Sequence, residues 1–150
     1  MFKRVVTTAF LMIGMLHSAI ATEDNAKSEI EAALTEWTAD FNARRADKIC
    51  ALFAPDVRAD VAGRPERDYD AVCNLLTRSL RDTTRSYTYT VEIKEILVFG
   101  QVAVVRLVWM LAVKNKEDGR ESTSVEPGMD LFRKQSDGAW RIIRYMAYEQ

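Results

Sequence analysis

The stretch YTYTVEIKEILVFGQVAVVRLVWMLAV, residues 87–113, decides the fold class of this chain of 150 residues. Apolar and polar residues alternate over residues 87–93, which is the period of a half-buried β-strand. After Glu95 the apolar residues occupy the other parity, and such a one-residue slip predicts a bulge that bends the strand. Residues 100–101 predict a tight turn, and the nearly continuous apolar run over residues 102–113 predicts a central strand.

Two further strands are predicted downstream of this stretch. Residues 116–119 and 136–138 contain the Gly, Asp and Ser typical of hairpin turns, and they bound a strand over residues 120–134. Residues 127–128 are Pro-Gly, which indicates an edge or irregular position within that strand. The last strand is predicted over residues 140–148, so the C-terminal half forms a four-stranded antiparallel meander.

The chain upstream has helical spacing instead. Apolar residues recur every three or four positions, which predicts a helix over residues 24–43, a short second helix over residues 47–53, and a third helix over residues 68–81. Pro55 would stop the second helix, and residues 57–61 could add a short strand. Helices followed by antiparallel strands make an α+β domain, and a bent sheet wrapped around three helices leaves a cavity in which a ligand would sit.

The N-terminus is typical of an export signal over residues 1–21. Lys3 and Arg4 precede a short apolar run, and residues 19–21 (Ala-Ile-Ala) fit the small-x-small cleavage pattern. The run is too short to span a bilayer permanently. We therefore expect a single domain over residues 22–150 that is periplasmic or secreted and not stably inserted in a membrane. An uncleaved anchor is the alternative.

The composition excludes several classes of function. The chain has 21 Lys and Arg against 22 Asp and Glu, so no basic excess points to nucleic acid. Its one histidine is His17, inside the predicted signal, which excludes Ser-His-Asp and Cys-His catalysis in the mature protein and removes the commonest zinc ligand. No Gly-rich phosphate loop or Cys/His cluster is present, so we expect no cofactor and no metal.

The two cysteines are Cys50 and Cys73. In an oxidising compartment an even number of cysteines favours a disulfide bond, which would have a structural role. Two buried free thiols are the alternative.

Two pairs of strings resemble the nuclear transport factor 2-like superfamily. Residues 42–44 (NAR) followed by 51–56 (ALFAPD) look like the junction of its first two helices. Residues 130–133 (DLFR) followed by 137–143 (DGAWRII) look like its last hairpin. Within the superfamily the chain is most similar to the SnoaL-like and ketosteroid-isomerase-like branch. The resemblance covers almost the whole mature chain, and it implies a cone formed by a curved sheet around three helices.

The resemblance also implies candidate catalytic residues. Isomerases of this branch use a Tyr on the first helix, an Asp base just beyond the second, and a second Asp in a D-x-F string. Trp37 stands at the Tyr position, and Asp130 at the D-x-F position. The base position falls on Val61, with Asp60 beside it. Asp60 as base and Asp130 as neutral donor would suit proton transfer without histidine, and Trp37 could supply a second donor. The alternatives are an ion-paired Asp130 and a solvated Asp60.

Arg106 is the one charge in an otherwise apolar strand. A buried Arg is costly unless it is paired, so it would either pair with Asp130 or Glu126 or face the cavity and await a ligand. The remaining pocket candidates, which could equally pack in the core, are aromatic: Trp109, Phe132 and Tyr145.

These features leave three functions open. The first is a small isomerase, cyclase or dehydratase that acts by carboxylate proton transfer. The second is a periplasmic binder of a small hydrophobic molecule without chemistry. The third, implied by the resemblance, is an assembly module that forms a homodimer through the open face of its sheet.

Overall fold

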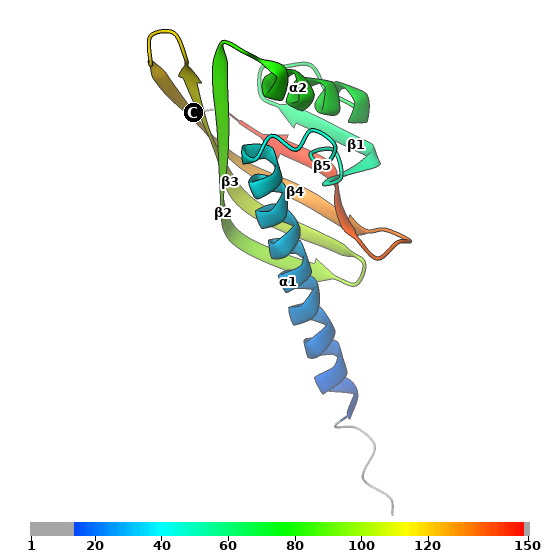
Figure 1. Cartoon of the computed structure of the whole chain (residues 1–150). Helices are drawn as coiled ribbons and strands as arrows, with labels where there is room; N and C mark the ends of the chain where they lie inside the picture. Colours follow the sequence, from blue (N-terminus) through cyan, green and yellow to red (C-terminus); the bar gives the residue numbers. More distant parts are fainter. Residues whose placement is uncertain (1–13, 149–150) are drawn as a thin grey trace, which may run out of the picture.

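A five-stranded sheet packed against two helices forms the domain, as seen in a computed structural model that describes residues 14–148 (Figure 1). The elements are, in chain order, α1 (Gly14–Asn42), β1 (Phe53–Val61), α2 (Tyr69–Arg81), β2 (Arg85–Phe99), β3 (Val102–Asn115), β4 (Glu121–Lys134) and β5 (Trp140–Ala147). Residues 1–13 of the predicted export signal lie outside the described residues, and residues 14–21 belong to α1. No helix within residues 14–148 combines the length and apolarity needed to cross a membrane.

The sheet confirms the α+β class and the antiparallel meander. Its strand order is β1-β5-β4-β3-β2, and the pairs β2–β3, β3–β4 and β4–β5 are antiparallel. The pairing of β2 with β3 shifts between Ile93 and Glu95, which is the bulge that the parity slip predicts. Residues 57–61 do form a strand, as the last part of β1, but β1 pairs parallel with β5. The sheet is therefore mixed rather than wholly antiparallel.

The structure has two helices where the sequence predicts three. Residues 46–52 form consecutive turns instead of a helix. Ile49 is fully buried there, and its carbonyl accepts a hydrogen bond of 2.6 Å from the indole N–H of Trp37. The carbonyl of Leu52 accepts another from the backbone N–H of Ile142, at 2.9 Å. A helix this short is marginal because nucleation is costly, and these tertiary contacts satisfy the backbone without it.

Helix α1 lies across one face of the sheet and α2 covers one end of it (Figure 1). We call the face turned toward the helices the inner face and the opposite one the outer face. Ile30, Leu34 and Phe41 of α1 are fully buried in the core, as the helical spacing predicts. Helix α2 begins after Asp68, whose carboxylate accepts a hydrogen bond of 2.9 Å from the backbone N–H of Ala71.

The predicted disulfide bond is present between Cys50 and Cys73. It joins the turns after α1 to helix α2, across 23 positions of sequence. This bond ties α2 covalently to the rest of the domain.

Candidate functional site

A cavity of about 320 Å³ lies on the inner face of the sheet, beneath α2. Helix α2 contributes Val72, Leu75 and Leu76 to its wall. The sheet contributes Leu111 from β3 and Ile142 from β5. Small-molecule sites are concave, mostly apolar, and carry a few polar groups, and this volume lies near the lower end of their usual range.

The carboxylate that lines this cavity is Glu126 of β4. The phenol of Tyr145 on β5 donates a hydrogen bond of 3.0 Å to its Oε2 atom. Gly128, two residues after Glu126 in β4, permits β5 to run close to β4. A Cβ atom at position 128 would lie 2.7 Å from the carbonyl oxygen of Met146. The local backbone therefore holds a carboxylate and a phenol together at the cavity wall.

Two tyrosine phenols of the cavity remain protonated. Burial raises the pKa of Tyr145 far above its ordinary value, and the negative charge of Glu126 adds to the rise. Burial also raises the pKa of Tyr89, on β2, with Glu126 again contributing. Within residues 14–148 no hydrogen-bond partner accepts from the Tyr89 phenol, so its O–H is available to a ligand.

Asp130 is fully buried behind the cavity wall rather than in it. It sits between Val105 and Tyr145 in the sheet register, and neither carboxyl oxygen has a hydrogen-bond partner among the described residues. Burial raises the pKa of Asp130 well above its usual range. The indole N–H of Trp109 is close enough to oppose that rise, but its geometry falls short of a hydrogen bond. Burial therefore favours the protonated, neutral form of Asp130.

No ion pair to Asp130 occurs in the described part of the chain, so the ion-paired alternative does not hold there. The arginines that could have supplied it are engaged elsewhere. Arg133 binds the carboxylate of Asp56 at 2.8 Å, and Arg141 binds Asp137.

Asp60 does not join Asp130. It is exposed and pairs in register with Met146 on the outer face, whereas its neighbours Ala59 and Val61 line the cavity. Adjacent residues of a strand point to opposite faces, so the two acids cannot act on one substrate. The position equivalent to the isomerase base, Val61, carries no acid.

Arg106 also lies on the outer face. It is exposed and its Nε lies 3.4 Å from Oε2 of Glu95, so it neither pairs with Asp130 or Glu126 nor faces the cavity. The physical reason is the alternation of β3, in which Val105 and Leu107 on either side are buried in the core. Strand β3 carries apolar residues on both faces, but the helices cover only its inner face (Figure 1).

The aromatic candidates divide between cavity and core. Trp37, Trp109 and Tyr145 line the cavity, but the Trp37 indole N–H is already donated to the Ile49 carbonyl and is not free for a ligand. Phe132 is fully buried and packs in the core instead.

From the sequence, Glu126 is expected as a possible partner for Arg106, and its place in the cavity is not predicted. A usable signal was nonetheless present, because Glu126 and Asp130 have the same parity in one strand. Residues two and four apart in a strand share a face, so a buried Asp130 places Glu126 on the inner face too.

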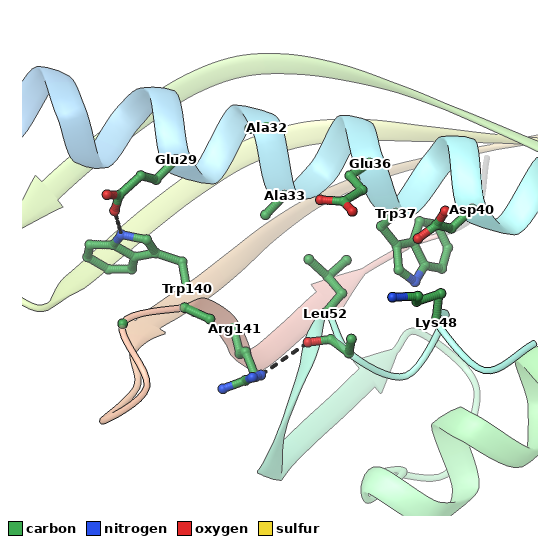
Figure 2. A pocket seen from close by; sticks show the side chains of 13 residues that line it. Glu29, Ala32, Ala33, Glu36, Trp37, Asp40, Lys48, Leu52, Trp140 and Arg141 are labelled. Atoms are coloured by element: carbon green, nitrogen blue, oxygen red, sulfur yellow. Dashed lines mark hydrogen bonds between the residues drawn. The ribbon is translucent and has the colours of Figure 1, made fainter. Parts of the chain in front are cut away.

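A second hollow, a groove of about 510 Å³, lies between α1 and the start of β5 (Figure 2). Two of its charged groups, Glu29 and Arg141, are engaged: Glu29 accepts hydrogen bonds from the Trp140 indole at 2.9 Å and from Lys134 at 2.8 Å. Arg141 donates to the Ala51 carbonyl at 3.2 Å. Because the lining already satisfies these groups, the groove is a weaker candidate than the cavity on the inner face.

Comparisons with known proteins agree on the fold. Residues 34–145 match the SnoaL-like domain family. None of the curated proteins matches this chain.

Three solved structures illustrate the likeness. A ketosteroid isomerase-like protein from Erwinia carotovora atroseptica is 24% identical, with a TM-score of 0.65 and coverage of 81% of this chain and 94% of that one. A nuclear transport factor 2-like protein with a cystatin-like fold from Novosphingobium aromaticivorans is 16% identical, with a TM-score of 0.72 and coverage of 94% and 92%. A proposed dehydratase of the same family from Streptomyces avermitilis is 15% identical, with a TM-score of 0.71 and coverage of 85% and 98%.

Proposed function

Because the chain belongs to the SnoaL-like domain family, we propose that it is a small isomerase, cyclase or dehydratase that works by carboxylate proton transfer in the inner-face cavity. The observation that carries the proposal is the placement of Glu126 in that cavity, with the Tyr145 phenol 3.0 Å from its carboxylate. This fold serves both catalytic and non-catalytic proteins, so the residues of the site, rather than family membership, support the proposed chemistry.

Glu126 takes the role of general base in this proposal. Its carboxylate removes a proton from a carbon next to a substrate carbonyl and returns the proton to another carbon, so the reaction is balanced without a redox partner. Tyr145 holds the carboxylate in position through its hydrogen bond. A base fixed on a β-strand by a neighbouring strand keeps the geometry that proton transfer needs.

Tyr89 takes the role of oxyanion donor. Its phenol lines the same cavity, and its raised pKa keeps the proton on the oxygen. A buried donor aimed at a developing enolate oxygen stabilises the transition state more than the ground state. Burial raises the pKa of Asp130 and so disfavours a second negative charge beside the developing enolate.

Hydrogen–deuterium exchange tests this proposal. The purified protein is incubated in D₂O with enolisable cyclic ketones, and deuterium at the carbon next to the carbonyl is followed by NMR. We expect Glu126→Gln to slow the exchange by about 10²–10⁴-fold. The matched control is Asp60→Asn, which removes a carboxylate from the outer face and should leave the rate unchanged.

Equal exchange rates in the wild type and Glu126→Gln would contradict the assignment of Glu126 as base. Binding of ketones without any exchange above the buffer rate would favour the alternative, a non-catalytic binder of small hydrophobic molecules that uses the same cavity.

We also propose that a second copy of the chain covers the outer face. Large apolar side chains are exposed there, and Phe99 keeps 65% of its surface accessible. The others on this face are Leu97, Met129 and Met146. Monomeric soluble proteins rarely expose large apolar patches. Charged residues of both signs, Arg106 and Asp60, lie beside it, so a two-fold mate could pair them.

Light scattering during size-exclusion chromatography tests the dimer. We expect a mass of two chains for the wild type and of one chain for the double variant Phe99→Ser, Met129→Ser. A wild-type mass of one chain at high protein concentration would overturn the dimer and leave the cavity proposal intact.

We propose, finally, that the protein is exported and cleaved after Ala21. The Cys50–Cys73 bond supports this, because disulfides persist mainly in oxidising compartments. Mass spectrometry of the protein from cell fractions should find an N-terminus at Thr22 in the periplasmic or secreted fraction. An intact N-terminus in the cytoplasm would contradict export.

A further inference from the structure

Arg67 is fixed at the mouth of the inner-face cavity by its backbone. The chain between β1 and α2 folds back so that Arg67 forms an isolated antiparallel bridge with Ala59. The Ala59 N–H donates to the Arg67 carbonyl at 2.8 Å, and the Arg67 N–H donates to the Ala59 carbonyl at 3.0 Å. Residues directly opposite each other in such a bridge point to the same side. Since Ala59 faces the cavity, the Arg67 side chain does too, and it is part of the cavity lining.

The guanidinium of Arg67 has no anion of its own. The side chain is half-buried, and within residues 14–148 it forms no ion pair and no side-chain hydrogen bond. Its positive charge reaches into the cavity, where it opposes the burial-driven rise of the Tyr89 pKa. A half-buried guanidinium without an ion-pair partner can accept an anionic ligand with less competition from protein groups.

The remaining walls define the rest of such a ligand. Beyond Arg67 and the exposed Arg64, the cavity is lined mainly by aliphatic and aromatic side chains, including Leu76 and Leu111. Glu126 lies among them and would repel a second negative charge. An acidic group therefore belongs at Arg67, and an uncharged apolar body belongs in the cavity. A guanidinium matches a carboxylate in a two-pronged, charge-assisted hydrogen bond.

We infer that the inner-face cavity binds a small amphipathic carboxylic acid, whose carboxylate pairs with Arg67 at the mouth and whose apolar body lies beneath α2. This inference deepens the proposed function by naming the substrate class of the same cavity, and it rests on that proposal only for the step from ligand to substrate. For catalysis, the reacting carbon would lie in the apolar body, near Glu126 and away from the carboxylate.

Isothermal titration calorimetry with two matched probes tests the inference. The full protein is titrated at neutral pH with 3-cyclohexylpropanoate and with the neutral 3-cyclohexylpropan-1-ol. We expect the acid to bind about 10–100-fold more tightly than the alcohol, the range for a hydrogen bond to a charged group. Arg67→Met should reduce the acid's affinity to that of the alcohol and leave the alcohol's affinity unchanged.

Arg58→Met is the matched control, because Arg58 lies on β1 with its exposed side chain next to Glu66 instead of in the cavity lining. It should retain the full preference for the acid. Arg67→Gln is a second variant in case Arg67→Met is unstable, since both variants keep the two backbone hydrogen bonds to Ala59. Equal affinities for acid and alcohol in the wild type, or an unchanged preference in folded Arg67→Met and Arg67→Gln, would overturn the inference.

The outcome is separable from the ketone exchange test. Loss of acid binding in Arg67→Met together with no exchange in the wild type would uphold the acid site and remove the proposed catalysis. Exchange that depends on Glu126, combined with no preference for the acid, would uphold the catalysis and remove the acid site.

Discussion

Residues one position apart in each strand of this sheet lie on opposite faces, and the two faces have different surroundings. On the inner face one row across the strands runs Val105, Asp130, Tyr145 and Ala59, and it is buried under the helices or lines the cavity. On the outer face the next row contains Arg106, Met129, Met146 and Asp60, all of them exposed. Both rows contain an acid and apolar groups, so composition alone does not separate them.

The comparison of the two rows shows that burial decides whether the pKa of an acid is shifted from its ordinary value. Asp130 is enclosed without a partner, and its pKa rises well above the usual range. On the outer face, Glu95 is exposed to solvent beside Arg106. Chemistry that needs a perturbed group is therefore confined to the inner face, and association between chains is the use that the outer face supports.

The largest effect expected from this comparison is on core packing. Phe132→Ala on the inner face should lower the free energy of unfolding by about 3–5 kcal/mol, because it leaves a cavity in a fully buried site. Leu97→Ala on the outer face, where the side chain keeps 44% of its surface accessible, should change it by only about 0.5 kcal/mol under conditions that keep the chain monomeric. Urea unfolding curves measure both, and similar losses would show that the outer face is also packed.

Removing the disulfide bond should have the next largest effect. The double variant Cys50→Ser, Cys73→Ser should lose about 3 kcal/mol of stability, because the bond limits the freedom of the unfolded chain across its loop. The same variant should bind cavity ligands more weakly than the wild type, since α2 forms the cavity roof. Unchanged stability on treating the wild type with a reductant would contradict this expectation.

A smaller effect is expected in the pH dependence of stability. The pKa of Asp130 is raised in the folded state, so the folded protein holds a proton that the unfolded chain releases above about pH 4. Stability should therefore fall as pH rises from about 4 toward the folded pKa, by at most about 1.4 kcal/mol per pH unit.

Asp130→Asn should remove that part of the slope, whereas Asp60→Asn on the outer face should retain it. Urea unfolding at a series of pH values measures the slope directly. Parallel pH profiles for the wild type and Asp130→Asn would mean that Asp130 is ionised or partnered in the folded protein.

The smallest effect belongs to the charges of the outer face. Arg106→Gln removes an exposed pair with Glu95 whose Nε–Oε2 distance is 3.4 Å, so the free energy of unfolding should change by at most about 1 kcal/mol. A loss of several kcal/mol would indicate that Arg106 is buried, for instance in a dimer, and raising the salt concentration would distinguish that case.

Local sequence patterns predicted those parts of the fold that depend on neighbours along the chain. The parity slip near Glu95 predicts the bulge of β2, and the helical spacing predicts the buried apolar residues of α1; the structure confirms both. Residues 46–52 escaped this reasoning because their short apolar run is buried by tertiary contacts and not by a helix. The parallel pairing of β1 with β5 is a long-range contact that no local pattern encodes.

The candidate site was predictable only in part. The resemblance predicts Asp130 as a pocket acid, and the structure buries it without a hydrogen-bond partner outside the cavity lining. Asp60 was its predicted companion, but choosing between Asp60 and Val61 required a one-residue register that only the pairing with β5 fixes. Glu126 lies in the cavity because it shares the parity of Asp130 in β4, and Arg67 lies there because a backbone bridge holds its loop against Ala59. That bridge has no sequence signature.

The central claim is that small ligands bind on the inner face beneath α2 and not in the outer-face hollow of about 750 Å³ that Met129 and Met146 line. NMR of methyl-labelled protein during titration with 3-cyclohexylpropanoate tests it most directly. We predict that shifts and ligand contacts concentrate on the methyl groups of Val72, Leu76 and Leu111, while Met129 and Met146 in the outer-face hollow stay unperturbed. Ligand contacts confined to Met129 and Met146, with an unperturbed cavity, would contradict the account.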